Sequence, residues 1–591
     1  MSKSLRLLAA LAVTGCLLLV LAGCDAFRDL PGIRSEQNPE YKIADCEPGI
    51  PSKLLRISVL HPPLTFNPVL AQDRVSALIA NQLTAALYRY NPITDTFEPG
   101  LATGFDRDKD SKVFTIHLRR NVFFSDGSPF TADDVMTTLN YIGNPDIKSP
   151  LRAYLEVADQ KLQFQKLDAE SIRCSSPEPL YALEPVLAKI VVLPRALIEG
   201  AASRNRMDRL YGADTPPAEL VSIGPFVLKS FSREEKKLVL GRNPYYWVVD
   251  AVGRPLPYLD EVVLDFTGTS TDISVKFRTG ESDLIDFIDP ADAARLENVR
   301  GLRIFDTGPS SATYVAWINQ NMKTDPASRE NYIPAFRLQW FFDAKFRHAL
   351  SLLFDRENII ASVFQRKAVT TGGLIAPGDG SWWSGLQADS FSTANARQLL
   401  TENGFVMNTS ITPNALYGAN KSPVQFTITV LTGDAFAERI GIQTERVCAS
   451  LGMKATMVSL PYDLFYQKIH STYDYDMAVM LLEQPTHPFF LKELMSWSSP
   501  GHLWYPEQGA PATPLEKDMA TALTTMYSSP DWGKRFEAAH QLEQYNAQGR
   551  YLIPIAKPHG LFGAKGKVQN LRVNHRCMSL MWNLEEVYVQ E

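Results

Sequence analysis

The chain has 591 residues, of which 45% are hydrophobic and 21% charged. This composition is typical of globular proteins, and the length requires two or more compact units. The net charge of −6, without any long basic run, argues against nucleic acid as the main partner.

The N-terminal residues have the layout of an export signal. Two basic residues precede an apolar stretch over 7–21, which is too short for a comfortable membrane span. The stretch ends in Leu-Ala-Gly followed by Cys24, and this resembles a bacterial lipobox, in which Cys24 would carry lipid. We expect removal of residues 1–23 and a polar tether over 24–53. The alternatives are an ordinary cleaved signal and an uncleaved anchor.

Four cysteines lie beyond the predicted anchor: Cys46, Cys174, Cys448 and Cys577. In the oxidising compartment that an export signal implies, disulfides persist. Four cysteines allow three complete pairings, among which the sequence does not choose. None has the spacing of a redox or metal motif, so we expect small buried residues or one structural bridge.

The first elements of the folded body follow the tether. Alternating apolar residues over 55–59 predict a strand, and apolar residues at helical spacing over 75–88 predict a helix.

The stretch 101–141 then predicts a strand, a tight turn and a capped helix. Apolar residues alternate over 114–118, and Asp126-Gly127 supplies the turn. Thr131 can cap the next helix, with Asp134 three residues on as an acidic capping box.

The order of side chains in 101–141 resembles the signature of the extracellular solute-binding proteins of family 5. These are the substrate-capturing subunits of ABC importers for oligopeptides, dipeptides, nickel and other cargo. The resemblance extends over about 54–554, and its further landmarks are 223–247, 257–264, 277–286, 311–319, 346–360, 375–378, 394–405, 473–480 and 553–555. We interpret the aromatic run 245–247 as core packing rather than as a stacking surface for ligand.

The resemblance implies an α/β fold with two lobes of the periplasmic-binding-protein type (type II, large, with an extra inserted subdomain), joined by a two-segment hinge. The strand–helix–strand order over 426–480 agrees with this fold. Residues 320–340 are longer than the usual connection, so this insertion is either a partner surface or a plain loop. The implied parts are lobe I over 54–92, 219–314 and 540–591, the inserted subdomain over 93–218 and lobe II over 315–539.

The sequence contains no enzyme constellation that we recognise. It lacks a nucleophile elbow, a phosphate-binding loop and a zinc-protease motif. The nine histidines are scattered, without the spacing of metal ligands. The sequence therefore predicts no catalytic residue, no metal and no cofactor.

The resemblance implies ligand binding in a cleft that closes by hinge bending. Tyr154 lies where peptide-binding members place a tyrosine, and Asn319 ends the strand that crosses into the second lobe. Trp382 and Trp383 follow the Pro-Gly landmark. Together with Glu483, these are the predicted ligand contacts.

Glu483 marks a departure from the family pattern. Peptide-binding members place an aspartate after the segment that corresponds to 473–480, and it holds the α-amine of the ligand by a charge-assisted bond. Here that position is Pro485, and Glu483 is the only carboxylate nearby. Either Glu483 replaces the missing aspartate, which is our first hypothesis, or the cargo has no free α-amine there.

The sequence thus predicts a monomeric lipoprotein at the periplasmic face of the bacterial cell membrane. It would capture peptide or peptide-like cargo and deliver it to an ABC permease and ATPase. The alternatives are a non-peptide cargo, such as a metal chelate or a glycoside, and a signalling or surface lipoprotein without a transport role. The sequence does not distinguish the inner from the outer membrane.

Overall fold

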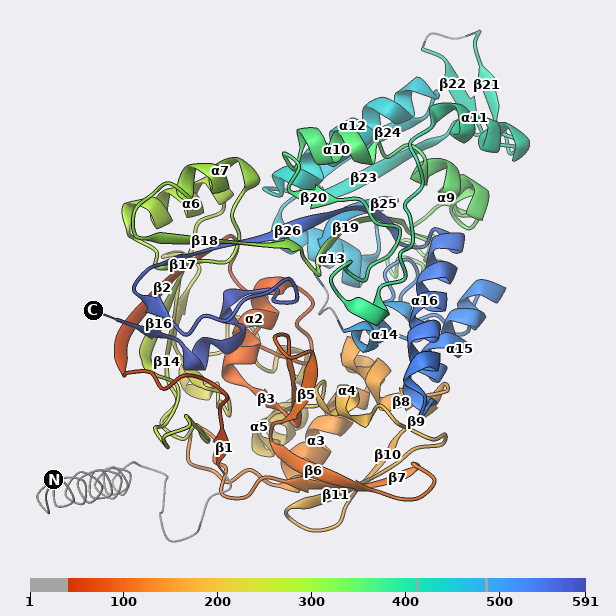
Figure 1. The fold of residues 1–591 in the computed structure, drawn as a ribbon. Helices are drawn as coiled ribbons and strands as arrows, with labels where there is room; N and C mark the ends of the chain where they lie inside the picture. Colours follow the sequence, from red (N-terminus) through yellow and green to blue (C-terminus); the bar gives the residue numbers. More distant parts are fainter. Residues whose placement is uncertain (1–40, 411–412, 484–486, 591) are drawn as a thin grey trace, which may run out of the picture.

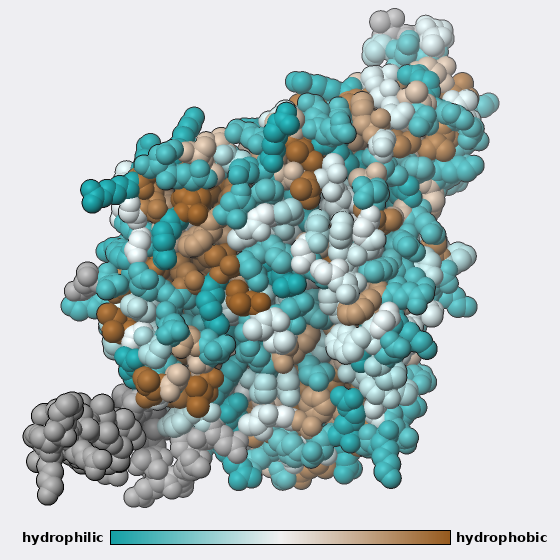
Figure 2. All heavy atoms as spheres, viewed as in Figure 1, coloured by the Kyte–Doolittle hydropathy of each residue, from teal (hydrophilic) through white to brown (hydrophobic). Residues whose placement is uncertain are grey.

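The computed structural model describes residues 41–410, 413–483 and 487–590 (Figure 1). Within this part of the chain, twelve strands form one mixed sheet that runs through both halves of the molecule. Hydrophilic residues dominate the face seen in Figure 2, interrupted by separate hydrophobic patches. Such a mixed surface is ordinary for a folded domain in water.

Lobe I is built on one half of this sheet. Its central strand β2 (Ser52–Val59) pairs in parallel with β16 (Leu259–Phe266) and β17 (Leu284–Ile285). Strands β14 (Lys237–Arg242) and β13 (Phe226–Ser232) extend the sheet in antiparallel order. The first predicted strand is confirmed, because residues 55–59 lie in β2 and the alternating apolar side chains are buried.

Lobe II is built on the other half. Strand β19 (Thr313–Ile318) pairs with β25 (Met477–Leu482), followed by β23 (Gln425–Leu431) and β24 (Lys454–Leu460). Strands β23 and β24 are parallel, and helix α12 (Ala435–Ser450) connects them. The predicted strand–helix–strand unit is confirmed.

Strand β26 (Ile553–Lys565) belongs to both lobes. Its first residues pair with β19 of lobe II, and its last residues pair with β17 of lobe I. The predicted return to lobe I at residue 540 falls inside helix α16 (Trp532–Gly549), before the strand that pairs with both lobes. The chain crosses within β26 instead.

The inserted subdomain carries a separate sheet of four strands. Its order is β10 (Gln163–Lys166), β11 (Ser171–Ser175), β7 (Val113–Leu118) and β6 (Ala102–Arg107). This sheet and the helix after β7 form the lower part of the molecule in Figure 1.

The capped helix predicted after the Asp-Gly turn is α3 (Ala132–Gly143). Thr131 and Asp134 form the capping box that the sequence predicts. Gly127 has φ +82°, a backbone conformation that other residues rarely adopt. These local predictions are confirmed.

The first predicted helix is shorter than expected. Helix α2 (Arg74–Leu83) ends five residues before the predicted boundary at Tyr88. The hydroxyl of Thr84 donates to the carbonyl of Ala80, and the next two residues form β3 (Ala85–Ala86), which pairs with a strand of the inserted subdomain. This distant pairing ends the helix.

The tether prediction over 24–53 is wrong at its C-terminal end. Strand β1 (Lys42–Ile43) pairs with β15 (Val248–Val249), and the amide of Gly49 donates to the hydroxyl of Tyr258 at 2.8 Å. Residues 41–53 therefore pack on the body. Residues 24–40, with Cys24, lie outside the described residues.

Two further predictions concern the cysteines and the insertion. Cys46, Cys174, Cys448 and Cys577 are all unpaired thiols, so a disulfide among them is wrong and the alternative of small, mostly buried residues holds. Within the insertion over 320–340, residues 322–332 form a mostly exposed loop, and the rest includes most of helix α8 (Ala335–Phe341).

Candidate functional site

A pocket of about 500 Å³ lies where the two lobes and the inserted subdomain meet. Helix α2 and strand β4 (Tyr88–Asn91) form the lobe I side, and the end of β25 with α13 (Tyr462–Gln467) forms the lobe II side. A third wall is the C-terminal return, residues 572–586. The volume is in the range of sites for small solutes.

The N-terminal end of α2 touches both lobes. Asp73 caps the helix by accepting from the amide of Ser76 at 2.9 Å, and it also accepts from the hydroxyl of Tyr462 in lobe II at 2.7 Å. The ring of Tyr462 stacks on His61 of lobe I, with 4.4 Å between ring centroids. Burial raises the pKa of the Asp73 carboxyl, although its hydrogen bonds act in the opposite direction. These contacts fix lobe II against the start of α2.

Arg74 makes a second connection between the lobes. Its guanidinium donates to the carboxylate of Glu483, to Asp286 Oδ2 at 3.0 Å and to the carbonyl of Met578 at 2.9 Å. Glu483 directly follows β25 in lobe II, whereas the other two acceptors lie in lobe I and the C-terminal return. Burial raises the pKa of Glu483, and the neighbouring guanidinium opposes this shift.

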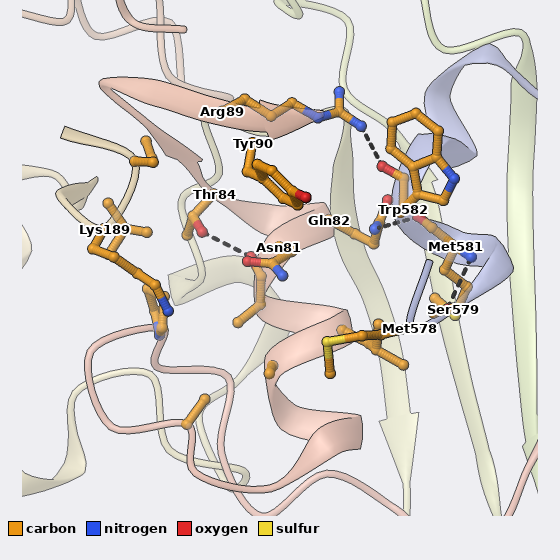
Figure 3. Close-up of a pocket in the computed structure, with 18 of the residues that line it drawn as sticks. Asn81, Gln82, Thr84, Arg89, Tyr90, Lys189, Met578, Ser579, Met581 and Trp582 are labelled. Carbon is orange, nitrogen blue, oxygen red and sulfur yellow. Dashed lines mark hydrogen bonds between the residues drawn. The ribbon is translucent and has the colours of Figure 1, made fainter. Parts of the chain in front are cut away.

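Several other charged side chains around the pocket are paired in the same way. Figure 3 shows Arg89 directed toward Trp582 of the C-terminal return, whose carbonyl it contacts. Each of these side chains therefore has its charge compensated within the protein. The pairs are Lys42 with Glu98, Arg89 with Glu585, Lys189 with Glu493 and Arg572 with Glu586.

Several neutral polar atoms of the lining are buried without a hydrogen-bond partner among the described residues. They are Gln72 Oε1, Gln82 Oε1, Trp247 Nε1 and both ring nitrogens of His470. Gln82 uses its amide nitrogen on the carbonyl of Met581 at 3.1 Å, which leaves its oxygen available. Such groups can donate to or accept from a bound solute.

Aromatic rings complete the lining. Tyr246 and Trp247 are 8% and 7% exposed, so they pack in the core, but both also line the pocket. Our interpretation of this run as core packing alone is therefore incomplete. Trp582 and Tyr466 line the pocket from other segments.

Of the five predicted ligand contacts, only Glu483 lines this pocket. Tyr154 is fully buried and donates to the carbonyl of Phe490 at 3.2 Å. Trp382 packs edge-on against Phe536, with 4.5 Å between ring centroids, and Trp383 lies outside the pocket with 40% of its surface exposed.

Asn319 also lies outside the pocket lining. Its amide donates to the backbone carbonyls of Tyr473 and Tyr475 at 2.7 and 2.8 Å, and its oxygen accepts from the amide of Asn321. The side chain is fully buried, and it holds the end of β19 against the segment before β25. Tyr154, Asn319, Trp382 and Trp383 therefore lie outside the lining of this pocket, and their contact with a ligand stays a prediction.

The sequence analysis missed Arg74, Gln82, Arg89 and His470. One signal was present in α2, where Arg74, Ala77 and Asn81 form a polar and small face opposite the apolar residues that enter the core. The wall formed by residues 572–586 had no local signal, since it reaches the pocket only through the tertiary fold.

Two features are absent from the described part of the chain. No group of three or more His, Cys, Asp or Glu side chains there could hold a metal ion. Likewise, none of the helices in that part has both the length and the apolar character needed to cross a membrane.

Together, the fold and the pocket define a two-lobed solute-binding protein, because the pocket walls come from both lobes and the lobes share strand β26. Residues 96–494, more than half of the chain, match the bacterial extracellular solute-binding proteins, family 5 (middle). The chain belongs to this family, and the predicted resemblance and fold class are confirmed.

Curated relatives support the same assignment. A probable ABC transporter-binding protein of Deinococcus radiodurans is 26% identical over 352 residues, which cover 58% of each chain. The periplasmic oligopeptide-binding protein OppA of Escherichia coli is 26% identical over 374 residues, 59% of this chain and 62% of the relative. The chain thus matches about three fifths of the length of these relatives.

Solved structures share the fold. The oligopeptide-binding protein AppA of Bacillus subtilis, in complex with a nonapeptide, has a TM-score of 0.77 at 17% identity, covering 92% of this chain and all of AppA. The binding protein MelB of Agrobacterium fabrum, in complex with stachyose, has a TM-score of 0.80 at 20% identity, covering 92% of this chain and 86% of MelB.

We expect Asn319→Ala to act on stability rather than on binding. The substitution leaves two buried carbonyls without their donor, which costs about 1–3 kcal/mol of unfolding free energy in urea denaturation. The exposed Asn298→Ala is the matched control, with an expected change within about 0.5 kcal/mol. An equally small effect at Asn319 would contradict the structural role.

We expect His470 to make stability depend on pH. Burial lowers its pKa from 6.5 to about 4, so from pH 6.5 down to about 4 the unfolded chain binds a proton that the folded chain excludes. The contribution of this residue to the free energy of unfolding is therefore complete above pH 6.5. As the pH is lowered below 6.5, this contribution decreases by at most about 1.4 kcal/mol per pH unit.

The test compares the wild type with His470→Phe, which keeps a ring against Tyr466 and removes the titration. Urea denaturation at several pH values between 7 and 4 should give a shallower loss of stability in the variant. Parallel curves for the two proteins would show that His470 does not contribute.

Proposed function

We propose that this protein is the substrate-binding subunit of an ABC importer. It captures peptide or peptide-like cargo between its two lobes and presents the cargo to a membrane permease with its ATPase. The observation that carries this proposal is the pocket itself, whose walls come from both lobes. Membership of the family and the relatives named as ABC transporter-binding and oligopeptide-binding proteins support it.

Closure of the lobes supplies the binding mechanism. The lobes are joined at β26 and at the short link from β18 (Leu302–Pro309) to β19, so bending at these two segments opens or closes the cleft. In the closed arrangement, Tyr462 reaches Asp73 and Glu483 reaches Arg74. Apolar and aromatic rings then bury the cargo, and neutral polar groups orient it.

We further propose that the mature protein is a monomer held at the periplasmic face of the cell membrane by lipid on Cys24. The lipobox-like sequence before Cys24 supports this proposal. The residues between Cys24 and β1 would then connect the anchor to the body, with which the chain first pairs at Lys42.

We expect the mature protein, purified without residues 1–24 from its own periplasm, to carry a heterogeneous ladder of peptides in native mass spectrometry. The control is Asn81→Trp, which places a large ring in the pocket from the exposed face of α2 and should abolish the ladder. A single bound mass that is not a peptide would show that the cargo is another solute. An empty wild type whose melting temperature is unchanged by peptide pools would contradict the capture of peptides.

We expect Cys24→Ser to release the protein from the membrane. The wild type should fractionate with membranes and incorporate an alkyne-labelled fatty acid, because the cysteine sulfur is the site of lipid attachment. The variant should lose the label. A variant that stays labelled in the membrane fraction would contradict lipidation at Cys24.

A further inference from the structure

We propose that Arg74 is a specificity-determining residue that supplies the positive partner of Glu483, so that the cargo carries no charged amine at this end of the pocket. This inference rests on the proposed function and narrows its cargo class to peptide-like molecules with a blocked or absent amino terminus, such as acylated or cyclic peptides. It replaces our first hypothesis, in which Glu483 holds the amine of the cargo.

The first argument is the geometry of Arg74. Its guanidinium is fixed from lobe I by Asp286 at 3.0 Å and by the carbonyl of Met578 at 2.9 Å. Both of these bonds come from Nη2, and the other terminal nitrogen, Nη1, donates to Glu483. Because two acceptors outside lobe II hold the guanidinium, it stays in place as lobe II approaches, and Glu483 meets a protein cation.

The second argument is the cost of an incoming ammonium. To bind Glu483, a cargo amine must displace a guanidinium that is also bonded to Asp286. Otherwise it must lie beside Arg74 as a second positive charge. Both arrangements bury a charge without full compensation, which is strongly unfavourable. Glu483 is thus a poor amine site as long as Arg74 is present.

The third argument is the character of the rest of the lining. Four ion pairs compensate most of the charge in the lining, and the buried atoms without a hydrogen-bond partner belong mainly to neutral groups, namely Gln72, Gln82, Trp247 and His470, beside Nε of Arg572. Amide oxygens and ring nitrogens recognise amide and hydroxyl groups. Burial lowers the pKa of His470 to about 4, so its ring is neutral at pH 7. The lining therefore suits an uncharged cargo that carries amides.

Two pools of tripeptide amides test this inference. The pools have the same sequences, and one is acetylated at the amino terminus whereas the other has free amines. Isothermal titration of the wild type should show binding of the acetylated pool. The affinity for the free-amine pool should be weaker by a factor of at least about ten.

Substitution of Arg74 should reverse this preference. Arg74→Met removes the cation and keeps much of the side-chain volume, so Glu483 becomes available and the free-amine pool should bind more tightly than the acetylated pool. Arg74→Lys retains the charge and should keep the wild-type preference. In Arg74→Met combined with Glu483→Gln, the carboxylate at position 483 is also removed, and the gain in amine affinity that depends on it should disappear.

The possible outcomes separate the two proposals. Preference of the wild type for free amines, or an unchanged ratio in Arg74→Met, overturns the inference and leaves peptide capture intact. Failure of the wild type and all variants to bind either pool overturns the peptide cargo and this inference with it. Melting temperatures of the variants, compared with the wild type, show that any loss of binding is not a loss of folding.

Discussion

The structure depends on one strand that two lobes share. Strand β26 pairs with β19 at its start and with β17 at its end, so the lobes form one sheet and can reorient only around the residues between these pairings. Lys557 lies in this stretch, and its buried ammonium donates to Ser311 O, Thr313 Oγ1 and Leu374 O. Burial lowers the pKa of Lys557 to about 8. The ammonium therefore ties β26 to the neighbouring link between lobes, which restricts closure to a small range of directions.

A restricted closure explains why contacts on opposite sides of the pocket can be matched in detail. Asp73 and Arg74 are adjacent at the start of α2, and their partners Tyr462 and Glu483 come from two different segments of lobe II. The two contacts form together only if lobe II approaches α2 in one orientation. Asp73 therefore caps α2 and also contacts lobe II. The start of the helix and the orientation of lobe II thus depend on the same residue.

The predictions that held were those decided within a few residues. The capping box at Thr131 and the alternating strands depend on near neighbours, and the parallel pair β23–β24 follows from a strand–helix–strand order. The end of α2 was missed because its competing partner lies about a hundred residues away in the inserted subdomain. Glu483 was identified, but its partner Arg74 is 409 residues distant in the chain, and no local pattern pairs them. The other four predicted contacts lie in short 3-10 helices or just beyond a helix or strand end, and three of them, Tyr154, Asn319 and Trp382, are buried against segments distant in the chain.

Charge compensation in the pocket has a consequence for selectivity. Contacts such as Arg74–Glu483 stabilise the closed arrangement whatever the cargo is, since both partners belong to the protein. Discrimination among solutes then depends on the groups that remain, which are aromatic faces and neutral hydrogen-bonding atoms. These groups reject a charged solute because its desolvation is not repaid, and they accept many uncharged ones, since an amide oxygen such as that of Gln82 bonds equally to any suitable donor. We therefore expect a binding protein of this design to accept varied uncharged cargo of the right size and to disfavour charged cargo.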